Sequence, residues 1–278
     1  MTPVPRADLH SHTTFSDGTS SPAELVEQAV AAKLAAIAVT DHDCVDGVAP
    51  AVAAAGGRVE VIAGVELTVA FRHVELHVLG LFVDPGSPAI QERLAAFRAA
   101  RKTRLAQMIE RLAAYDVSVT LEEVLALSEH GAAGRPHLAQ TLVRRGYVKT
   151  PEEAFARFLG DDAPCFVRGA TMTPAMAAAL IRDAGGVSAL AHPARFVPDA
   201  WLPELIADGI QGIEANHPDH SHATAERYRQ YAQEHHLLVT GGSDAHGAWK
   251  TKGPVIGAVT IPYADVERLK AAAAQARG

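Results

Sequence analysis

The sequence predicts an α/β protein built on a parallel β-sheet that is either open or closed into a barrel. Short apolar runs typical of buried strands alternate along the chain with segments that have helical spacing of their apolar residues. Strands that alternate with helices favour a parallel sheet, because each helix carries the chain back to the same end of the sheet. With 278 residues, of which 48% are hydrophobic, the chain can bury one large core.

The first strand is expected within residues 4 to 9, and a helix follows it. Ser21-Pro22-Ala23-Glu24 combines a serine cap, proline at the first helical position and glutamate three residues after the cap. Further strands are expected at residues 35–40, 59–68, 74–83, 187–191, 210–215, 237–240 and 255–261. Helices between the later strands are expected at residues 174–184, 201–207 and 223–235. In the run 74–83, alternation places His73, Glu75 and His77 on one face.

The middle of the chain breaks this rhythm. Residues 87–171 show mainly helical patterns, with a long helix first and shorter helices at 121–127, 136–145 and 151–159. We therefore expect a helical insertion that caps the active site, between a first part of the barrel (residues 1–86) and a second part (residues 172–278). Arg98, Arg101, Lys102, Arg104 and Arg111 form a basic face of the long helix. This face is interpreted as solvated, with a strip that guides a nucleotide chain as the alternative.

Composition restricts the possible partners and location. The net charge of −7 argues against a general surface for long nucleic acids, which requires clustered Lys and Arg. Two cysteines are too few for a disulfide framework, and neither a signal peptide nor a membrane-spanning run is visible. We expect a cytoplasmic protein that does not bind membranes, and no obligatory protein partner is evident.

Histidine and carboxylate residues gather at the predicted strand ends. Asp8-Leu9-His10-Ser11-His12 follows the first strand, and Gly242-Ser243-Asp244-Ala245-His246 follows a late one. Side chains of an extended strand alternate, so His10 and His12 can hold one ion together. Imidazole with carboxylate and without thiolate suits Zn, Mn or Fe rather than a structural zinc site. Active sites of barrels lie at the carboxyl ends of the strands. The pattern indicates a hydrolase with several metal ions.

These motifs closely resemble those of the PHP family, which is named after polymerases and histidinol phosphatase. The resemblance follows the order of the chain outside the insertion. It rests on the two motifs above together with Ser16-Asp17-Gly18, Thr40-Asp41-His42-Asp43, Gly64-Val65-Glu66 and Ala191-His192-Pro193. It implies a distorted (β/α)7 barrel with up to three divalent ions at the carboxyl ends of the strands.

The resemblance also implies how the ligands are shared. The first ion would be held by His10, His12, Glu66 and Asp244. Glu66 would bridge to a second ion on His77 and His192, and a third would lie on Asp17, His42 and His246. Two or three ions of Mn, Zn or Fe are expected, and a bridging hydroxide would attack phosphorus. Glu66 and Asp244 are thus predicted to take part in catalysis, and His217, after another strand, is predicted to protonate the leaving oxygen or hold a phosphate.

Substrate contacts are expected outside the metal ligands. Arg135 precedes a helix begun by Pro136, and a guanidinium at a helix N-terminus makes an anion site. Gly134-Arg135-Pro136-His137-Leu138-Ala139 resembles the group of the family that removes the 3′-phosphate from nucleoside 3′,5′-bisphosphates or trims short oligonucleotides. The further predicted contacts are His137, Arg195, His217 and Asp43.

Two other functions are left open. A histidinol phosphatase would share the metal site but would use other phosphate ligands than the Gly134–Ala139 segment. A metal-binding regulatory module without turnover would be marked by a lost ligand, and all nine ligand positions carry the expected residue type. We therefore predict a small phosphorylated nucleotide as the substrate, with short single-stranded oligonucleotides as a further possibility.

Overall fold

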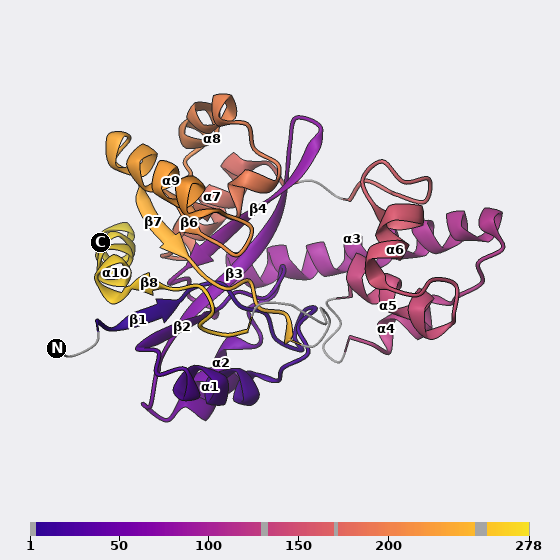
Figure 1. The fold of residues 1–278 in the computed structure, drawn as a ribbon, viewed down its shortest axis with the longest axis horizontal. Helices are drawn as coiled ribbons and strands as arrows, with labels where there is room; N and C mark the ends of the chain where they lie inside the picture. Colours follow the sequence, from indigo (N-terminus) through magenta and orange to yellow (C-terminus); the bar gives the residue numbers. More distant parts are fainter. Residues whose placement is uncertain (1–3, 129–132, 170–171, 248–254, 278) are drawn as a thin grey trace.

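The protein is an α/β barrel with a group of helices beside it, as Figure 1 shows for the computed structural model. The structure describes residues 4–128, 133–169, 172–247 and 255–277. Eight strands form one sheet in the order β7-β6-β5-β4-β3-β2-β1-β8. Their bounds are β1 (Arg6–Asp8), β2 (Ala36–Val39), β3 (Glu60–Phe71), β4 (Val74–Leu81), β5 (Val187–Leu190), β6 (Gly212–Asn216), β7 (Leu238–Gly241) and β8 (Ile261–Pro262).

The segments that follow β1 and β7 are hydrogen-bonded to each other. The Leu9 N–H donates to Gly241 O at 3.1 Å, and the Asp244 N–H donates to His10 O at 2.9 Å. Ser11 continues this contact as a parallel bridge to Ala245. These bonds nearly close the barrel and bring the first and last ligand motifs of the sequence side by side. The predicted α/β barrel is confirmed.

Helices cover the outside of the barrel and form the insertion. Their bounds are α1 (Pro22–Ala31), α2 (Val48–Ala55), α3 (Pro88–Leu112), α4 (Leu121–Leu125), α5 (Arg135–Arg144), α6 (Pro151–Ala154), α7 (Pro174–Asp183), α8 (Leu202–Ala207), α9 (His222–Glu234) and α10 (Tyr263–Ala276). The expected capping box begins α1: the Ser21 side chain accepts from the Glu24 N–H, and the Glu24 side chain accepts from the Ser21 N–H. Of the helices in the described ranges, none combines the length and the apolar character needed to cross a membrane.

The expectation of a uniformly parallel sheet is wrong at β4. This strand runs antiparallel to both β3 and β5. Only Arg72 and His73 separate β3 from β4, and Arg72 has a positive φ of 55°. Two residues are enough for a hairpin but far too few for the crossover that a parallel neighbour needs. The hairpin places His77 opposite Thr68, two residues from Glu66.

The expected strand at residues 255–261 is largely absent. Among the described residues of that run, only Ile261 belongs to a strand, and β8 pairs antiparallel with β1. Residues 256–257 form a turn and residues 258–259 a bend, and Gly257 has a φ of 81°. The Gly257 N–H donates to Asp8 Oδ2 at 2.8 Å. The segment therefore serves as a loop that binds the end of β1.

The long helix α3 joins two hydrophobic cores. Ile90, Leu94 and Phe97 on its first half pack in the core around β3, β4 and α7. Leu105, Met108 and Leu112 on its second half pack with residues of α4, α5 and η2 (Phe155–Leu159) in a separate core. In Figure 1, α3 runs from the barrel to the group formed by α4, α5 and α6. The exact bounds of the insertion, at residues 87 and 171, stay a prediction.

Candidate metal centre

All nine predicted metal-ligand residues lie together at one end of the barrel. His10, His12 and Asp17 follow β1, His42 follows β2, Glu66 lies in β3 and His77 in β4, His192 follows β5, and Asp244 and His246 follow β7. We call these nine residues the metal-ligand cluster. Most of them are buried, and His42, His77 and His246 are partly exposed.

Four side chains form the first group of the metal-ligand cluster. His10 Nε2 lies 3.3 Å from both Glu66 Oε2 and Asp244 Oδ1. His12 Nε2 lies 3.2 Å from the same two oxygens. A tetrahedral ion with ligand bonds of about 2.0–2.1 Å separates its ligand atoms by roughly 3.3 Å. These are the four residues that the resemblance assigns to the first ion, and their role as its ligands stays a prediction.

A second group is built around the other oxygen of the same glutamate. Glu66 Oε1 lies 3.0 Å from His77 Nδ1 and 3.1 Å from His192 Nε2. The two imidazole nitrogens are 3.3 Å apart. Glu66 thus presents one oxygen to each group, which is the arrangement of a carboxylate that bridges two ions.

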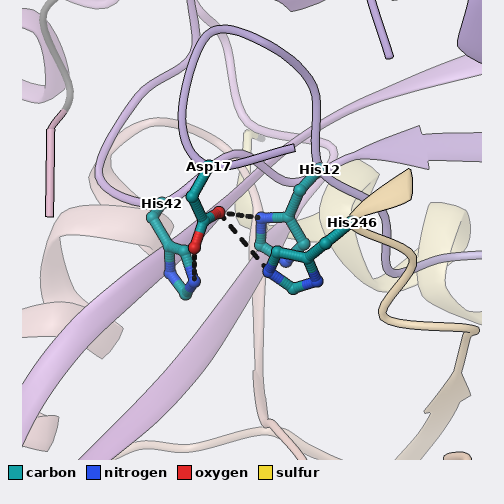
Figure 2. Close-up of side chains that lie close together, drawn as sticks. All are labelled: His12, Asp17, His42 and His246. Atoms are coloured by element: carbon teal, nitrogen blue, oxygen red, sulfur yellow. Dashed lines mark ion pairs between the residues drawn. The ribbon is translucent and has the colours of Figure 1, made fainter. Parts of the chain in front are cut away.

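The third group surrounds Asp17, as Figure 2 shows. Asp17 Oδ2 lies 3.8 Å from His42 Nε2, and Asp17 Oδ1 lies 3.4 Å from His246 Nε2. His12 Nδ1 also faces this carboxylate, at 3.7 Å. His42 turns its other nitrogen, Nδ1, towards Glu66 Oε2 at 3.1 Å. His12 and His42 therefore connect this group with the other two. The resemblance assigns only Asp17, His42 and His246 to the third ion, whereas His12 also faces Asp17 in the structure.

Unsatisfied polar atoms test whether the residues fit metal ions. Buried side-chain atoms without a hydrogen-bond partner among the described residues include His10 Nε2, both ring nitrogens of His12, His42 Nδ1 and Glu66 Oε2. Buried polar groups are normally paired, and leaving one unpaired costs about 1–3 kcal/mol. These atoms all face one another within the metal-ligand cluster, so the donor set fits divalent cations.

The charges of the cluster favour cation binding. Burial tends to raise the pKa of Glu66, but the rings of His77 and His42 outweigh burial and hold that pKa well below its usual range. Burial opposes protonation of His12, yet Asp244 and Glu66 raise the pKa of its ring to about 10. The carboxylates therefore stay ionised, and the negative charge that draws a proton to His12 would draw a divalent cation in its place.

Glu214 is a buried residue of the site that the sequence reading missed. It lies on β6, is 0% exposed, and its Oε1 accepts from His10 Nδ1 at 2.9 Å. Its Oε2 accepts from the His192 N–H at 2.7 Å. A proton on His10 Nδ1 leaves the Nε2 lone pair free for an ion. The signal was present in the sequence as a carboxylate within an apolar strand, between Ile213 and Ala215.

Asp8 and a strained backbone fix the loop after β7. Asp8 Oδ1 accepts from the Ser243 N–H at 2.8 Å. A Cβ on Gly242 would overlap the backbone nitrogen of His10, so only glycine allows this close approach of the two motifs. Asp244 and His192 have positive φ values of 50° and 29°. Non-glycine residues rarely adopt these values outside sites where the surrounding structure imposes them.

His217, predicted to act in catalysis, lies against the metal-ligand cluster. Its Nδ1 accepts from the Asp219 N–H at 3.1 Å, so the neutral ring carries its proton on Nε2. That nitrogen lies 3.4 Å from Asp244 Oδ2. The ring is 4% exposed. His217 thus contacts a predicted metal ligand directly.

Three arginines border a cavity beside the cluster. Arg101 and Arg104 of α3 and Arg135 of α5 line a cavity of about 120 Å³, which we call the arginine cavity. Its wall also contains Asp17, His42 and His77 of the metal-ligand cluster. The interpretation of Arg101 and Arg104 as a solvated face is wrong, because these side chains are only 19% and 11% exposed. Their burial results from the packing of α3 against β4, and this contact between distant segments cannot be predicted from the sequence of the helix alone.

The other predicted substrate contacts lie in different surroundings. Asp43 accepts from the Thr68 N–H at 3.0 Å and lies 2.8 Å from Arg101. His137 is 1% exposed, and its Nδ1 accepts from the Gly134 N–H at 3.1 Å. This bond gives His137 a role at the start of α5, and its contact with substrate stays a prediction.

Arg195 borders a second, wider cavity of about 450 Å³, which Asp17 also lines. Its lining includes Pro136 and Phe155, which also line the arginine cavity, and His246. Arg195 is 40% exposed and lies 3.2 Å from Asp219. Both cavities therefore border the metal-ligand cluster at Asp17 and share an apolar wall.

Comparison with known proteins agrees with this geometry. The family model of the PHP domain matches residues 8–151. A 3′,5′-nucleoside bisphosphate phosphatase from Chromobacterium violaceum is 34% identical over 246 residues, which cover 86% of each chain. The 5′-3′ exoribonuclease Rnm of Escherichia coli is 33% identical over 247 residues, which cover 86% of this chain and 84% of that one.

A solved structure gives the same result. A candidate metal-dependent phosphoesterase from Bifidobacterium adolescentis superposes with a TM-score of 0.89 at 34% identity, over 97% of each chain. The full-length similarity agrees with the assembled His and carboxylate cluster. The chain therefore belongs to the PHP family and is a metal-dependent phosphoester hydrolase.

Proposed function

We propose that the enzyme removes the 3′-phosphate from nucleoside 3′,5′-bisphosphates and also cleaves short single-stranded oligonucleotides. The observation that carries this proposal is the position of the arginine cavity, whose wall includes His42 and His77 of the metal-ligand cluster. A substrate with two phosphates can place one at the cluster and the other among Arg101, Arg104 and Arg135. Guanidinium groups bind phosphate through paired, charge-assisted hydrogen bonds.

The metal-ligand cluster would hold two or three divalent ions, of Mn, Zn or Fe. Ions in such a site would activate water and stabilise the oxygens of the reacting phosphate. Glu66 would hold two of them together, since its two oxygens face different ligand groups. Glu214 would orient His10, and Asp8 would fix the loop that carries Asp244.

His217 is the residue proposed to supply a proton to the leaving oxygen. Its neutral ring carries a proton on Nε2, which faces Asp244. Asp244 also lies within 3.3 Å of His10 and His12, so this proton would lie next to a phosphate bound at the metal-ligand cluster. Arg195 would contact the part of the substrate that enters the wider cavity, and Phe155 offers an aromatic ring there for stacking with a base.

Charge argues against histidinol phosphate as the substrate. Histidinol phosphate carries a positively charged amine next to its single phosphate, and three arginines would repel that amine. A silent regulatory module is disfavoured because all nine ligands are present and face one another. A nucleoside bisphosphate can place one phosphate at the metal-ligand cluster and the other at the three arginines, whereas histidinol phosphate has only one phosphate.

A panel of substrates tests the proposal. Phosphate release by the Mn-loaded protein is measured with adenosine 3′,5′-bisphosphate, 3′-AMP, 5′-AMP and histidinol phosphate, and shortening of a 5′-phosphorylated RNA trimer is followed in parallel. We expect the bisphosphate to have the highest kcat/KM and 3′-AMP a lower one, because it lacks the 5′-phosphate. Preference for histidinol phosphate, or equal rates for 3′-AMP and the bisphosphate, would refute the proposal.

A further inference from the structure

Glu75 occupies the arginine cavity together with the three arginines. Its Oε1 lies 2.8 Å from Arg135 and its Oε2 lies 3.2 Å from Arg104. The side chain is 20% exposed and belongs to β4, two residues before His77. A carboxylate therefore sits where the proposed function places the 5′-phosphate, and each of its oxygens faces one arginine.

We infer that Glu75 competes with the substrate and product 5′-phosphate for Arg135 and Arg104, and that it thereby limits affinity and promotes product release. The inference rests on the proposed function. The 5′-phosphate is present in both adenosine 3′,5′-bisphosphate and its product 5′-AMP, so the arginines bind both equally. Binding of this kind does not accelerate the chemical step. If it is too strong, the product leaves slowly.

The alternative is that Glu75 only holds the arginines in place. Each arginine has its own second anchor, which makes this alternative weaker. Arg135 also donates to Asp161 at 2.5 Å and to Leu159 O at 3.3 Å. Arg104 donates to Val167 O at 2.6 Å. With Glu75 removed, these bonds would still orient both guanidiniums, so the main change is a lost negative charge.

The hydrogen-bonding groups of the arginines also favour competition between Glu75 and a phosphate. Arg104 has a buried terminal nitrogen, Nη2, without a hydrogen-bond partner among the described residues. The carboxylate of Glu75 has two oxygens and one charge, whereas a phosphate monoester has three free oxygens and about two charges. The phosphate therefore offers the two arginines more acceptor oxygens and more charge than Glu75 does, and it can displace Glu75 at a cost in affinity.

The test compares Glu75→Gln with wild type in the metal-loaded protein. Calorimetry measures binding of 5′-AMP, with adenosine as a ligand that lacks the phosphate. Glutamine keeps the shape and one acceptor oxygen but removes the charge. We expect the Kd for 5′-AMP to fall about tenfold or more, because a like charge next to the bound anion is removed. The Kd for adenosine should stay unchanged.

A matched control is Glu204→Gln. Glu204 pairs with Arg72 at 2.6 Å, and neither residue lines the arginine cavity or the wider cavity, so this variant removes the same charge from a Glu–Arg pair away from the site. Its Kd for 5′-AMP should stay close to that of wild type. Thermal unfolding of both variants checks that the fold is retained. An unchanged or weaker affinity in Glu75→Gln would show that Glu75 positions the arginines, and would overturn the inference.

A double variant tests whether the effect passes through the arginines. In the Arg135→Ala background, Glu75→Gln should improve 5′-AMP binding by a smaller factor, since one of the two pairs is missing. A gain of the same size would overturn the role as a direct competitor. Failure of the proposed function would be seen in a different measurement. Wild type would then not prefer adenosine 3′,5′-bisphosphate in the substrate panel, whatever the effect of Glu75→Gln on 5′-AMP.

Discussion

The metal-ligand cluster and the arginine cavity share a wall, yet they are built in different ways. The cluster is carried by barrel strands and the loops that follow them, and side chains such as His10 and Glu66 are at most 1% exposed. The arginines of the cavity come from α3 and α5, and Arg101 and Arg135 are 19% and 18% exposed. The centre of the cluster is closed off from solvent, whereas the arginines line a cavity beside it.

The difference separates catalysis from recognition. The cluster needs fixed distances between ligand atoms, and buried hydrogen bonds from Glu214 and Asp8 supply them. In the proposed function the arginine cavity would have to release a product that resembles the substrate, and its Arg104 and Arg135 are paired with Glu75, the carboxylate inferred above to compete with the phosphate. We therefore expect changes in the cluster to affect turnover strongly and changes in the cavity to affect mainly binding.

The largest effect should come from Glu66→Ala. Both first-group and second-group contacts lose their shared carboxylate, so we expect kcat/KM to fall by about 10³-fold or more and the bound metal to decrease. Metal content by mass spectrometry and phosphate release are measured on the same samples. Glu60→Gln is the control, because Glu60 lies on the same strand but pairs with Lys270. Wild-type turnover in Glu66→Ala would contradict the role of the bridge.

Glu214→Gln should have the next largest effect. The amide cannot accept both the His10 ring proton and the His192 N–H as the carboxylate does. Loss of such an outer partner typically weakens metal binding by about 10–100-fold. Titration with Mn²⁺ followed by calorimetry measures this directly and without turnover. If the affinity stays at the wild-type value, the barrel holds His10 in place without Glu214.

A smaller effect, limited to binding, is expected for Arg135→Ala. The KM for adenosine 3′,5′-bisphosphate should rise by about tenfold with little change in kcat, since Arg135 would provide uniform binding. The KM for 3′-AMP, which has no 5′-phosphate, should hardly change. Arg98→Ala is the control, because Arg98 lies on α3 next to Asp46 rather than in the arginine cavity. A fall in kcat of the same size would remove the distinction between the two regions.

The two regions also differ in how far the sequence could predict them. His10 and His12 lie two residues apart on an extended segment, so their side chains share one face. Because this motif is local, residue type and spacing were enough to predict that the two rings lie together. Arg101 and Arg104 were interpreted as exposed because helical spacing alone does not say which neighbour a face meets. The antiparallel β4 was missed because a two-residue turn, Arg72-His73, carries no glycine or asparagine to announce a hairpin. Contacts between distant segments decided each of these cases.

The smallest effect concerns the start of α5, which joins the two regions. Burial lowers the pKa of His137, although Asp17 acts in the opposite direction. A histidine with a lowered pKa in the folded state is protonated more readily after unfolding. Its contribution to stability is therefore fully present above the unfolded pKa of about 6.5 and is lost as pH falls below it.

In His137→Asn this titration is removed, so the difference in Tm between wild type and variant should narrow from pH 7 to pH 5. Each unit of pKa difference corresponds to about 1.4 kcal/mol, which bounds the effect to a few degrees. Gln140→Ala, on the same helix α5, removes no titrating group and should show a constant difference. A gap that stays constant for His137→Asn would mean that the ring is not held neutral by burial, and its contact with substrate would then become the better explanation for its position.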